Sequence, residues 1–400
     1  MQKSVLFLGA NRLMSNAIKM VKALGHRVVV MDKNENAFAF KYADQVAIVD
    51  FFHPEKVYQY LNESKESIHA VIAANDAGVR SAAYVSEKLN IINHSIETSL
   101  ACTDKGLMRT KWKEQNISQP PFEIVDNANA LENAINRIGI PCVIKPCYSW
   151  GSRGVSIISE PQHLQKAIQF TTQNDYEGRH YIVEKAIEGT EYTVEGLAKN
   201  GNISILTTSD KVPQNHIIYR VAMQLNYPAQ LSNEKLETLQ QLVKDAAKVL
   251  GIENGAIHAE CIYDGEKFQM VELAGRPGGG HIFGYIVEAV SGICMPQVLT
   301  QILLNENPNI EATQQKGACY KFFAPAQSGK FIGIEGLEKA QQNPYLLDIG
   351  FDMIPGTFFE GEVATDMGRP GFIVSKGSNR EDAIKNAERT HQSLVIKIEN

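Results

Sequence analysis

The sequence predicts a chain of three lobes: an α/β lobe, then a small α+β lobe, then a larger antiparallel α+β lobe. Its 400 residues exceed what one hydrophobic core usually organises. Short apolar strands alternate with amphipathic helices in the first quarter, which is typical of a parallel, doubly wound sheet. From about residue 256 onward, apolar residues recur at every second position, which indicates antiparallel strands. We expect lobes at 1–95, 96–195 and 196–400.

The first lobe begins with a buried strand at residues 4–8 (SVLFL), and the strand RVVVMD ends at Asp32. Further strands are expected at 46–50 and 69–76. Gly9 and Asp32 resemble parts of a dinucleotide-binding fingerprint, but its second and third glycines are absent. We interpret Gly9 as part of a structural turn, and a nicotinamide enzyme is the weaker interpretation.

The two later lobes follow an extended break at Pro120–Pro121. A strand that ends at Lys145 and another at 181–187 are expected in the middle lobe. A long amphipathic helix is expected from about Ser232 to Leu250, because apolar side chains recur there at helical spacing. The last helix is expected at about 380–391.

Composition narrows the class of protein. The chain is 44% hydrophobic and 21% charged, as in ordinary globular proteins. A net charge of −6 provides no basic field for nucleic acid, although local lysines can still bind a phosphate ligand. The six cysteines form no CxxC pair and indicate a reducing compartment. The N-terminal apolar run is too short for a signal peptide, so we expect a cytoplasmic protein without a membrane partner.

The stretch PCVIKPCYSWGSRGV, residues 141–155, combines a buried strand with a bendable loop. Lys145 ends the strand, where alternation would bury its charge unless it reaches an anion. Gly151 and Gly154 permit a tight loop whose N–H groups can face phosphate oxygens. The alternative is a common surface lysine at a strand end. We expect residues 148–154 to act as a lid.

The stretch VEKAIEGTEYTVE, residues 183–195, can hold a nucleoside. An adenine ring needs a backbone donor and acceptor from an extended segment, and Glu184 with the backbone of 185–187 could supply them. The carboxylate of Glu191 could accept from ribose hydroxyls. Taken alone, the stretch favours the other interpretation, a solvated, charged face of a hairpin.

The most specific stretch is GAIHAECIYDGEKFQMVELAGRPGGG, which predicts a hairpin. Alternation places His258 and Glu260 on one face of the first strand, and Glu272 with Met270 on one face of the second. The two glutamates lie opposite each other if the loop has three or five residues. Facing carboxylates repel without a cation. Oxygen ligands suit Mg²⁺, with Mn²⁺ as an alternative. A wet sheet face with two exposed glutamates is the other interpretation.

In this order, the segments TDKGLMRTKW (103–112), PCVIKP…GSRGV, VEKAIEGTEYTVE, HAECIYD and VELAGRPGGG resemble the ATP-grasp superfamily. The resemblance covers about residues 100–290 and is to its carboxylate–amine ligase branch, which includes bacterial L-amino-acid (dipeptide) ligases. It implies an ATP-grasp fold with a Rossmann-like N-terminal domain, a small ATP-binding lobe and a larger antiparallel lobe with a C-terminal extension.

The resemblance also implies roles for individual side chains. For the nucleotide, Lys105, Lys145 and Ser152 would bind the phosphates, Glu184, Lys185 and Ile187 would bind the adenine, and Glu191 would bind the ribose. Glu260 and Glu272 would bind the magnesium, and Gly279, Gly280 and His281 would bind the substrate. Arg276, with Lys145, would take part in catalysis by stabilising the transferred phosphate and the acyl intermediate.

Two positions depart from the pattern of the family. Ala274 stands where many members have an asparagine, which leaves fewer side chains for the metal. Tyr148 and Trp150 stand where smaller residues are usual, and they could pack against the substrate or against a neighbouring lobe. Residues 211–231 are expected to border the substrate pocket.

The resemblance implies an ATP-dependent carboxylate–amine ligase. It would form an amide or peptide bond through an acyl phosphate, act on small carboxylates and amines such as amino acids, and release ADP and phosphate. A homodimer is the family-based expectation. One alternative is a bicarbonate-using carboxylase of the same superfamily, and another is a noncatalytic nucleotide-binding sensor.

Overall fold

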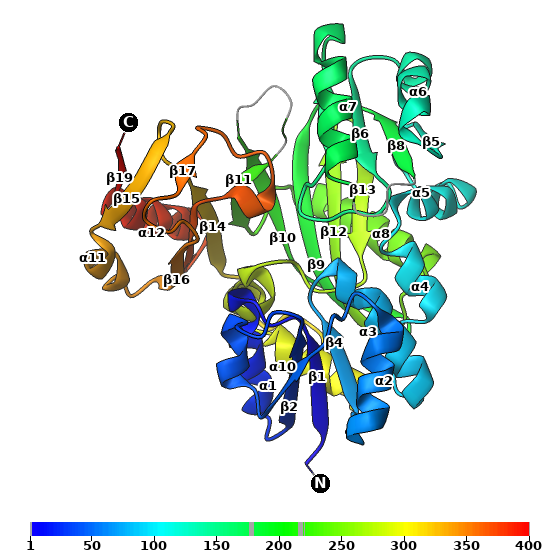
Figure 1. Cartoon of the computed structure of the whole chain (residues 1–400), viewed down its shortest axis with the longest axis vertical. Coiled ribbons are helices and arrows are strands. Elements are labelled where there is room, and N and C mark those ends of the chain that lie inside the picture. Colours follow the sequence, from blue (N-terminus) through cyan, green and yellow to red (C-terminus); the bar gives the residue numbers. More distant parts are fainter. Residues whose placement is uncertain (1, 176–179, 215–218, 220, 400) are drawn as a thin grey trace.

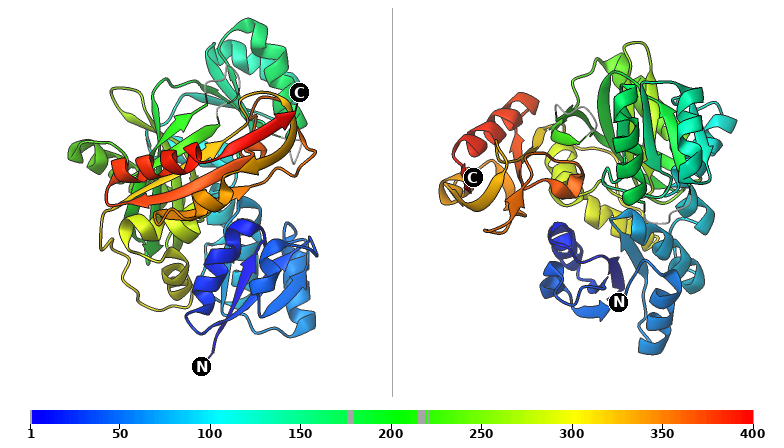
Figure 2. Two further views of the ribbon diagram at one scale, coloured as in Figure 1. Left: turned by 90° about the vertical axis from the view of Figure 1, so that its left-hand side faces the viewer. Right: turned by 45° about the horizontal axis from the view of Figure 1, so that its top comes forward.

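In the computed structural model, the described residues form four sheets, and three of them are arranged around the fourth, a long antiparallel sheet (Figure 1). The structure describes residues 2–175, 180–214, 219 and 221–399, without the side chain of residue 367. The N-terminal lobe, the small lobe and the C-terminal segment surround the central sheet on different sides (Figures 1 and 2).

The N-terminal lobe contains a parallel sheet in the order β3-β2-β1-β4, as the alternation of strands and helices predicts. Its strands are β1 (Ser4–Leu8), β2 (Arg27–Asp32), β3 (Gln45–Ile48) and β4 (Ala70–Ala73), and its helices are α1 (Ser15–Lys22), α2 (Pro54–Ser64) and α3 (Asp76–Leu89), with 3₁₀ turns η1 (Arg12–Met14) and η2 (Phe38–Tyr42). Asn75 caps α3 by accepting from the N–H of Gly78 at 2.8 Å, so Asp76 stands at the helix start beside the end of β4.

The small lobe is an antiparallel sheet in the order β5-β8-β6-β7. Its elements are β5 (Phe122–Val125), α6 (Leu131–Ile138), β6 (Cys142–Pro146), β7 (Ser156–Ile158), α7 (Leu164–Gln173) and β8 (Tyr181–Lys185), and two helices precede it, α4 (Ile96–Ala101) and α5 (Lys105–Glu114). The strand β6 ends one residue after Lys145, close to the end that the sequence predicts.

The central sheet has eight antiparallel strands in the order β13-β12-β9-β10-β11-β14-β18-β16. They are β9 (Thr190–Lys199), β10 (Asn202–Pro213), β11 (Ala222–Tyr227), β12 (Gly255–Tyr263), β13 (Phe268–Ala274), β14 (Gly317–Phe323), β16 (Leu346–Phe351) and β18 (Gly371–Gly377). The helices that accompany it are α8 (Asn233–Val249), α9 (Val287–Ser291), α10 (Met295–Leu303) and α12 (Arg380–Gln392), with the π-helical turn η5 (Ile282–Ile286).

A third antiparallel sheet, in the order β17-β15-β19, lies in the C-terminal segment (Figure 2). It consists of β15 (Gly329–Glu335), β17 (Phe358–Phe359) and β19 (Val395–Glu399), and the helix α11 (Leu337–Gln341) and the 3₁₀ turn η6 (Asp366–Gly368) lie between these strands in the sequence. The turn η6 becomes important below, because it reaches the loop after β6.

One buried cluster joins the N-terminal lobe to the central sheet. It contains Phe7 of β1 together with Leu225 of β11, Phe283 of η5 and Leu299 of α10. Burial of apolar side chains is the main force that holds such an interface together. The N-terminal lobe is therefore fixed against the sheet that carries the hairpin β12–β13.

Within the described ranges, no single helix combines the length and apolar character needed to cross a membrane. The consecutive helical segments Ile282–Ser291 and Met295–Leu303 together have the length and composition of a membrane span, but the chain bends by 105° between them.

Candidate active site

Glu260 and Glu272 face each other across the antiparallel pair β12–β13. The connecting loop has four residues, 264–267, so the two glutamates face each other although the condition of a three- or five-residue loop is not met. With an even loop and regular pairing, Glu260 would lie opposite Val271. A β-bulge next to Glu260 adds one residue to β13 and brings Glu272 opposite instead.

The same bulge corrects a second expectation, that Glu272 shares a face with Met270. Met270 pairs with Cys261, their sulfur atoms are 3.3 Å apart, and both are in the core beneath the sheet. Glu272 points to the opposite face. A bulge cannot be read from apolar alternation, because the alternation is what it interrupts.

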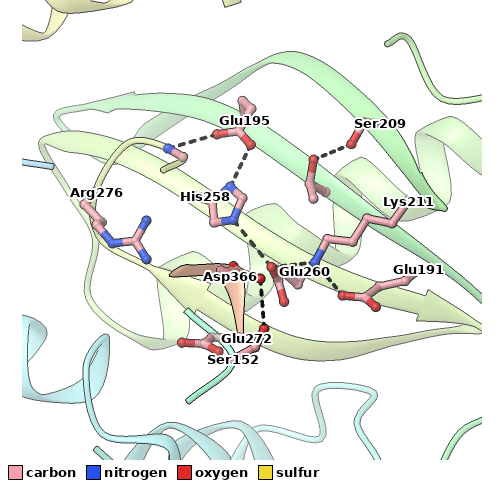
Figure 3. Close-up of polar contacts among 12 residues, drawn as sticks. Ser152, Glu191, Glu195, Ser209, Lys211, His258, Glu260, Glu272, Arg276 and Asp366 are labelled. Carbon is pink, nitrogen blue, oxygen red and sulfur yellow. Dashed lines mark hydrogen bonds and ion pairs between the residues drawn. The ribbon is translucent and has the colours of Figure 1, made fainter. Parts of the chain in front are cut away.

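Lys211 of β10 links two of the predicted carboxylates (Figure 3). Its Nζ lies 2.5 Å from Glu191 Oε1 and 2.6 Å from Glu260 Oε1. Burial would raise the pKa of Glu260, but the charge of Lys211 and the contact with His258 hold it well below its usual range. Burial would lower the pKa of Lys211, and the two glutamates raise it instead. Both groups are therefore charged at neutral pH.

Lys105, at the start of α5, occupies the equivalent place beside the second glutamate. Its Nζ lies 3.2 Å from Glu272 Oε1 and donates to the carbonyl oxygen of Ser149 at 2.6 Å. The two facing glutamates thus lie beside different lysines, and Lys211 is shared with Glu191.

The donor set at this face consists of carboxylate oxygens. In the part of the chain that the structure describes, no group of three or more His, Cys, Asp or Glu side chains could hold a metal ion. Two facing carboxylates without further protein ligands suit Mg²⁺, which keeps water and phosphate oxygens in its other positions. Glu260 and Glu272 therefore fit this ion, and their role as its ligands stays a prediction.

Lys145 is buried inside a charged group. Its Nζ lies 2.7 Å from Glu184 Oε2, and Glu184 Oε1 lies 2.6 Å from Arg109 Nε. Burial would raise the pKa of Glu184, but Arg109 and Lys145 lower it to about 2. Burial lowers the pKa of Lys145, and Glu184 offsets this only in part. Both oxygens of Glu184 thus pair with cations, and its expected contact with adenine stays a prediction.

Arg109 was not predicted from the sequence as a site residue. Its guanidinium donates to the carbonyl oxygens of Met270 at 2.5 Å and Val271 at 3.0 Å, on the bulged strand. It therefore joins α5, the small lobe and β13.

The expected adenine segment after β8 is held by neighbouring backbone. The N–H of Lys185 donates to the carbonyl oxygen of Pro121 at 2.9 Å, and the N–H of Ala186 donates to the carbonyl oxygen of Pro141 at 3.1 Å. The Lys185 ammonium reaches the carbonyl of Ile140 at 3.4 Å. The adenine role of Lys185 and Ile187 stays a prediction.

The loop 148–154 packs against a neighbouring lobe through its aromatic residues. The Arg80 guanidinium lies 3.9 Å from the centre of the Tyr148 ring, and Trp150 contacts Phe52 edge to face at 5.9 Å. Arg80 and Phe52 belong to the N-terminal lobe. Of the two alternatives left open by the sequence, packing against a neighbouring lobe is the one this structure contains.

The other side of this loop contacts the C-terminal segment. Ser152 Oγ donates to Asp366 Oδ1 at 3.3 Å, and the N–H of Asp366 donates to the carbonyl of Gly151 at 3.2 Å (Figure 3). Arg369 lies 2.7 Å from the same Asp366 oxygen. Ser152 has a left-handed backbone, φ 60°, beside Gly151 at 63°. The phosphate contact of Ser152 stays a prediction.

Arg276 follows β13 and is held by the N-terminal lobe. One of its terminal nitrogens lies 2.6 Å from Asp76 Oδ2, and both side chains are nearly buried, at 12% and 6% exposed. Burial would lower the pKa of Arg276, but Asp76 raises it. Asp76 was not expected at this site, because no local pattern links it to a residue 200 positions away.

The glycine run that follows is fixed by close neighbours. A Cβ on Gly278 would lie 2.7 Å from Glu195 Oε2, and one on Gly280 would lie 2.7 Å from the Tyr320 hydroxyl. Gly280 also has φ 65°, which favours glycine. Nothing lies within 4 Å of a Cβ on Gly279. The substrate role of Gly279 and Gly280 stays a prediction.

His281 lies in an aromatic cluster with Tyr285, Tyr320 and Phe372. Its side chain is 2% exposed, and burial lowers its pKa to about 3, so the ring is neutral. Neither ring nitrogen has a hydrogen-bond partner among the described residues, and Asp348 Oδ2 is 3.6 Å from Nδ1. Its predicted contact with a substrate stays a prediction.

His258 faces the glutamates, as alternation predicts, and it pairs with a residue that the sequence did not single out. Its Nδ1 lies 2.6 Å from Glu195 Oε1 of β9. Burial would lower the pKa of His258, but Glu195 raises it to about 9. Register could have identified this pair, since β9 and β12 bring Glu195 opposite His258. Residues 215–218 and 220 of the expected pocket segment 211–231 lie outside the described residues.

Two family models match separate parts of the chain. An ATP-grasp domain matches residues 138–284, which include the strand of Lys145, the hairpin and the glycine run. L-amino acid ligase C-terminal domain 2 matches residues 321–399, which include Asp366.

Similar proteins cover nearly the whole chain. A formate-dependent phosphoribosylglycinamide formyltransferase of Mannheimia haemolytica is 24% identical over 98% of this chain and 96% of its own length. The crystal structure of an L-amino acid ligase from Bacillus licheniformis matches with a TM-score of 0.86 and 21% identity, over 100% of this chain and 99% of that one. A phosphoribosylglycinamide synthetase structure from Anaerococcus prevotii matches with a TM-score of 0.77 and 20% identity, over 100% of both chains. At these identities the structural matches establish the fold.

Proposed function

We propose that this chain, an ATP- and Mg²⁺-dependent carboxylate–amine ligase with an ATP-grasp domain at residues 138–284, joins amino acids through a peptide bond. The observation that carries the proposal is the pair of facing glutamates, Glu260 and Glu272, each beside a lysine. Arg276 follows two residues after the end of β13, at the start of the glycine run.

The chemistry explains why such an arrangement is needed. A carboxylate is a poor electrophile, because its leaving group would be an oxide ion. Transfer of the γ-phosphoryl group of ATP to the carboxylate gives an acyl phosphate and ADP, and attack by an amine then forms the amide and releases phosphate. The protein contributes mainly by positioning the reactants and balancing charge.

We assign these tasks to side chains of this chain. Lys105, Lys145 and Lys211 balance the charge of the nucleotide phosphates, and Arg276 stabilises the oxyanion that forms during acyl transfer. Glu260 and Glu272 would hold Mg²⁺. When bound, this ion would neutralise part of the negative charge of the phosphates. The loop 148–154 keeps water from the acyl phosphate.

Two findings support amino acids as the substrate class. Residues 321–399 match the C-terminal domain 2 of L-amino acid ligases, and this part contacts the loop 148–154 through Asp366. The structural match to the L-amino acid ligase of Bacillus licheniformis covers the whole chain. Amino acids carry both the carboxylate and the amine that the reaction requires.

A second candidate follows from the sequence matches. Relatives called formate-dependent phosphoribosylglycinamide formyltransferases are about 24% identical across nearly the full length. On this reading the carboxylate would be formate, and the amine would belong to a phosphorylated ribosyl compound. The phosphoryl transfer beside the glutamates would be the same, and both the carboxylate and the amine would differ.

The experiment is an ADP-release assay with defined acceptors. We expect release that depends on pairs of amino acids, and a dipeptide as product by mass spectrometry. Release that requires formate and phosphoribosylglycinamide would favour the second candidate, and release that requires bicarbonate would favour a carboxylase. No dipeptide from any of the amino-acid pairs would contradict the proposal.

Glu272→Gln tests the metal assignment separately. The change keeps the shape of the side chain and removes one charge of the facing pair, so we expect a loss of turnover on the order of 10²–10³. The matched control is Glu266→Gln in the loop of the same hairpin, where the side chain is exposed. Near-normal turnover of the Glu272 variant would show that the metal assignment is wrong.

A further inference from the structure

We propose that Glu195 is a positioning residue that fixes Glu260, the predicted metal ligand, and the glycine run 278–280, the predicted substrate segment, relative to each other. One carboxylate oxygen acts on Glu260 through His258, and the other holds the glycine run through Gly278. The inference rests on the proposed function, because it takes Glu260 as a metal ligand.

The first half of the arrangement lies within the sheet. Glu195 of β9 is opposite His258 of β12, and its Oε1 is 2.6 Å from His258 Nδ1. This contact orients the ring so that Nε2 faces Glu260, at 3.7 Å from Oε1. Glu260 is therefore approached by His258 from one side and by Lys211 from the other (Figure 3). Groups behind a metal ligand commonly set its orientation in this manner.

The second half leaves the sheet. Glu195 Oε2 accepts from the backbone N–H of Gly278 at 3.2 Å. The approach is so close that a Cβ on Gly278 would lie 2.7 Å and 2.9 Å from the two carboxylate oxygens. The glycine run that follows Arg276 thus rests directly on Glu195, and its backbone position depends on this carboxylate.

The burial of Glu195 argues against a role in stability alone. Its side chain is 0% exposed, and that of His258 is 13% exposed. Removing a carboxylate from water opposes folding, and a well-packed apolar pair often holds a structure at least as well. What an apolar pair could not do is orient Glu260 and accept from Gly278 at the same time.

Two substitutions separate the two halves. His258→Gln leaves the Gly278 contact in place, so we expect about a 10- to 100-fold weaker metal affinity with an unchanged KM for the carboxylate substrate. Glu195→Ala removes both contacts, so we expect the metal affinity to fall and this KM to rise together. Metal affinity is measured as Mn²⁺ binding by water-proton relaxation in the presence of ADP, which needs no turnover.

The control is Glu253→Ala, an exposed glutamate just before β12, which should change neither quantity. If Glu195→Ala does not fold, Glu195→Gln combined with His258→Gln removes the buried charges and should still weaken Mn²⁺ binding. Unchanged Mn²⁺ binding in the His258 variant, or a Glu195 variant that loses only thermal stability, would overturn the inference. A failure of every amino-acid assay would instead contradict the proposed function, and the Mn²⁺ measurement would still decide the role of His258.

Discussion

At the scale of single residues, the site consists of carboxylates that already have cationic partners. Glu184 pairs with Lys145 and Arg109, Glu260 with Lys211, and Glu272 with Lys105. Such pairing satisfies buried charge, which would otherwise be very costly. It also means that an incoming nucleotide exchanges one set of ion pairs for another, so its binding does not have to bury charges for the first time.

Glu184 leads to a prediction about pH. Its pKa is lowered from 4.5 to about 2, so its stabilising effect is complete above pH 4.5 and is lost as the pH falls toward 2. Glu184→Gln should lower the free energy of unfolding by about 3–5 kcal/mol at pH 7, because it leaves two buried cations without their carboxylate. Urea unfolding at several pH values should show the difference from the wild type shrinking below pH 4.5. A difference that stays constant down to pH 3 would contradict this account.

Lys211 leads to a prediction about rate. It is the cation between Glu191 and Glu260, and Lys211→Met removes the positive charge that these two carboxylates share. We expect kcat to fall by about 10²–10³. The matched control is Lys199→Met, at the end of the neighbouring strand β9, which should retain full activity. Equal kcat in the two variants would exclude Lys211 from the site.

At the scale of elements, the loop 148–154 is held from both sides. Trp150 contacts Phe52 of the N-terminal lobe, and Ser152 contacts Asp366 of the C-terminal segment. The chain has two tryptophans, and the other, Trp112, is fully buried in α5. Trp150 is therefore a usable reporter of what this loop does when a nucleotide binds.

We predict that ADP with Mg²⁺ changes the fluorescence of the protein and that Trp150→Phe abolishes the change.

Asp366→Ala should raise KM for ATP by about two- to tenfold, which corresponds to the free energy of one or two hydrogen bonds. The variant should also increase the release of ADP that yields no amide. The control is Glu338→Gln, an exposed residue of α11. An Asp366 variant with normal KM and normal coupling would show that the contact with Ser152 is incidental.

The elements also show how far the sequence could be read. Alternation predicted the hairpin and placed Glu260 and Glu272 on facing strands, because side chains in a strand point alternately to its two faces. It could not predict the bulge beside Cys261, which depends on local backbone geometry. Asp76 and Asp366 were missed because they arrive from lobes far away in the sequence, where no periodic pattern connects them to the hairpin.

At the scale of the whole molecule, the site lies where the N-terminal lobe, the small lobe, the central sheet and the C-terminal segment meet. The N-terminal lobe contributes Asp76 and Arg80, the central sheet carries the glutamates, and the C-terminal segment contributes Asp366. Asp76 and Arg80 lie one turn apart on α3, and they contact Arg276 and the ring of Tyr148 respectively. One helix thus contacts both Arg276 and the loop 148–154.

This arrangement predicts that the N-terminal lobe is needed for catalysis even though it carries none of the predicted ATP ligands. Asp76→Asn removes the charge that faces Arg276, in a pair whose side chains are only 6% and 12% exposed. Breaking such a pair should lower the free energy of unfolding by about 3–5 kcal/mol. It should also lower kcat, since Arg276 would no longer be held in one position, and hydrogen exchange should rise around residues 276–280. The control is Glu97→Gln, which removes an ion pair with Lys111 in which the glutamate is 79% exposed, and it should cost less than about 1 kcal/mol. If Asp76→Asn loses stability but keeps full kcat and normal exchange in the glycine run, then α3 stabilises the fold without positioning the arginine.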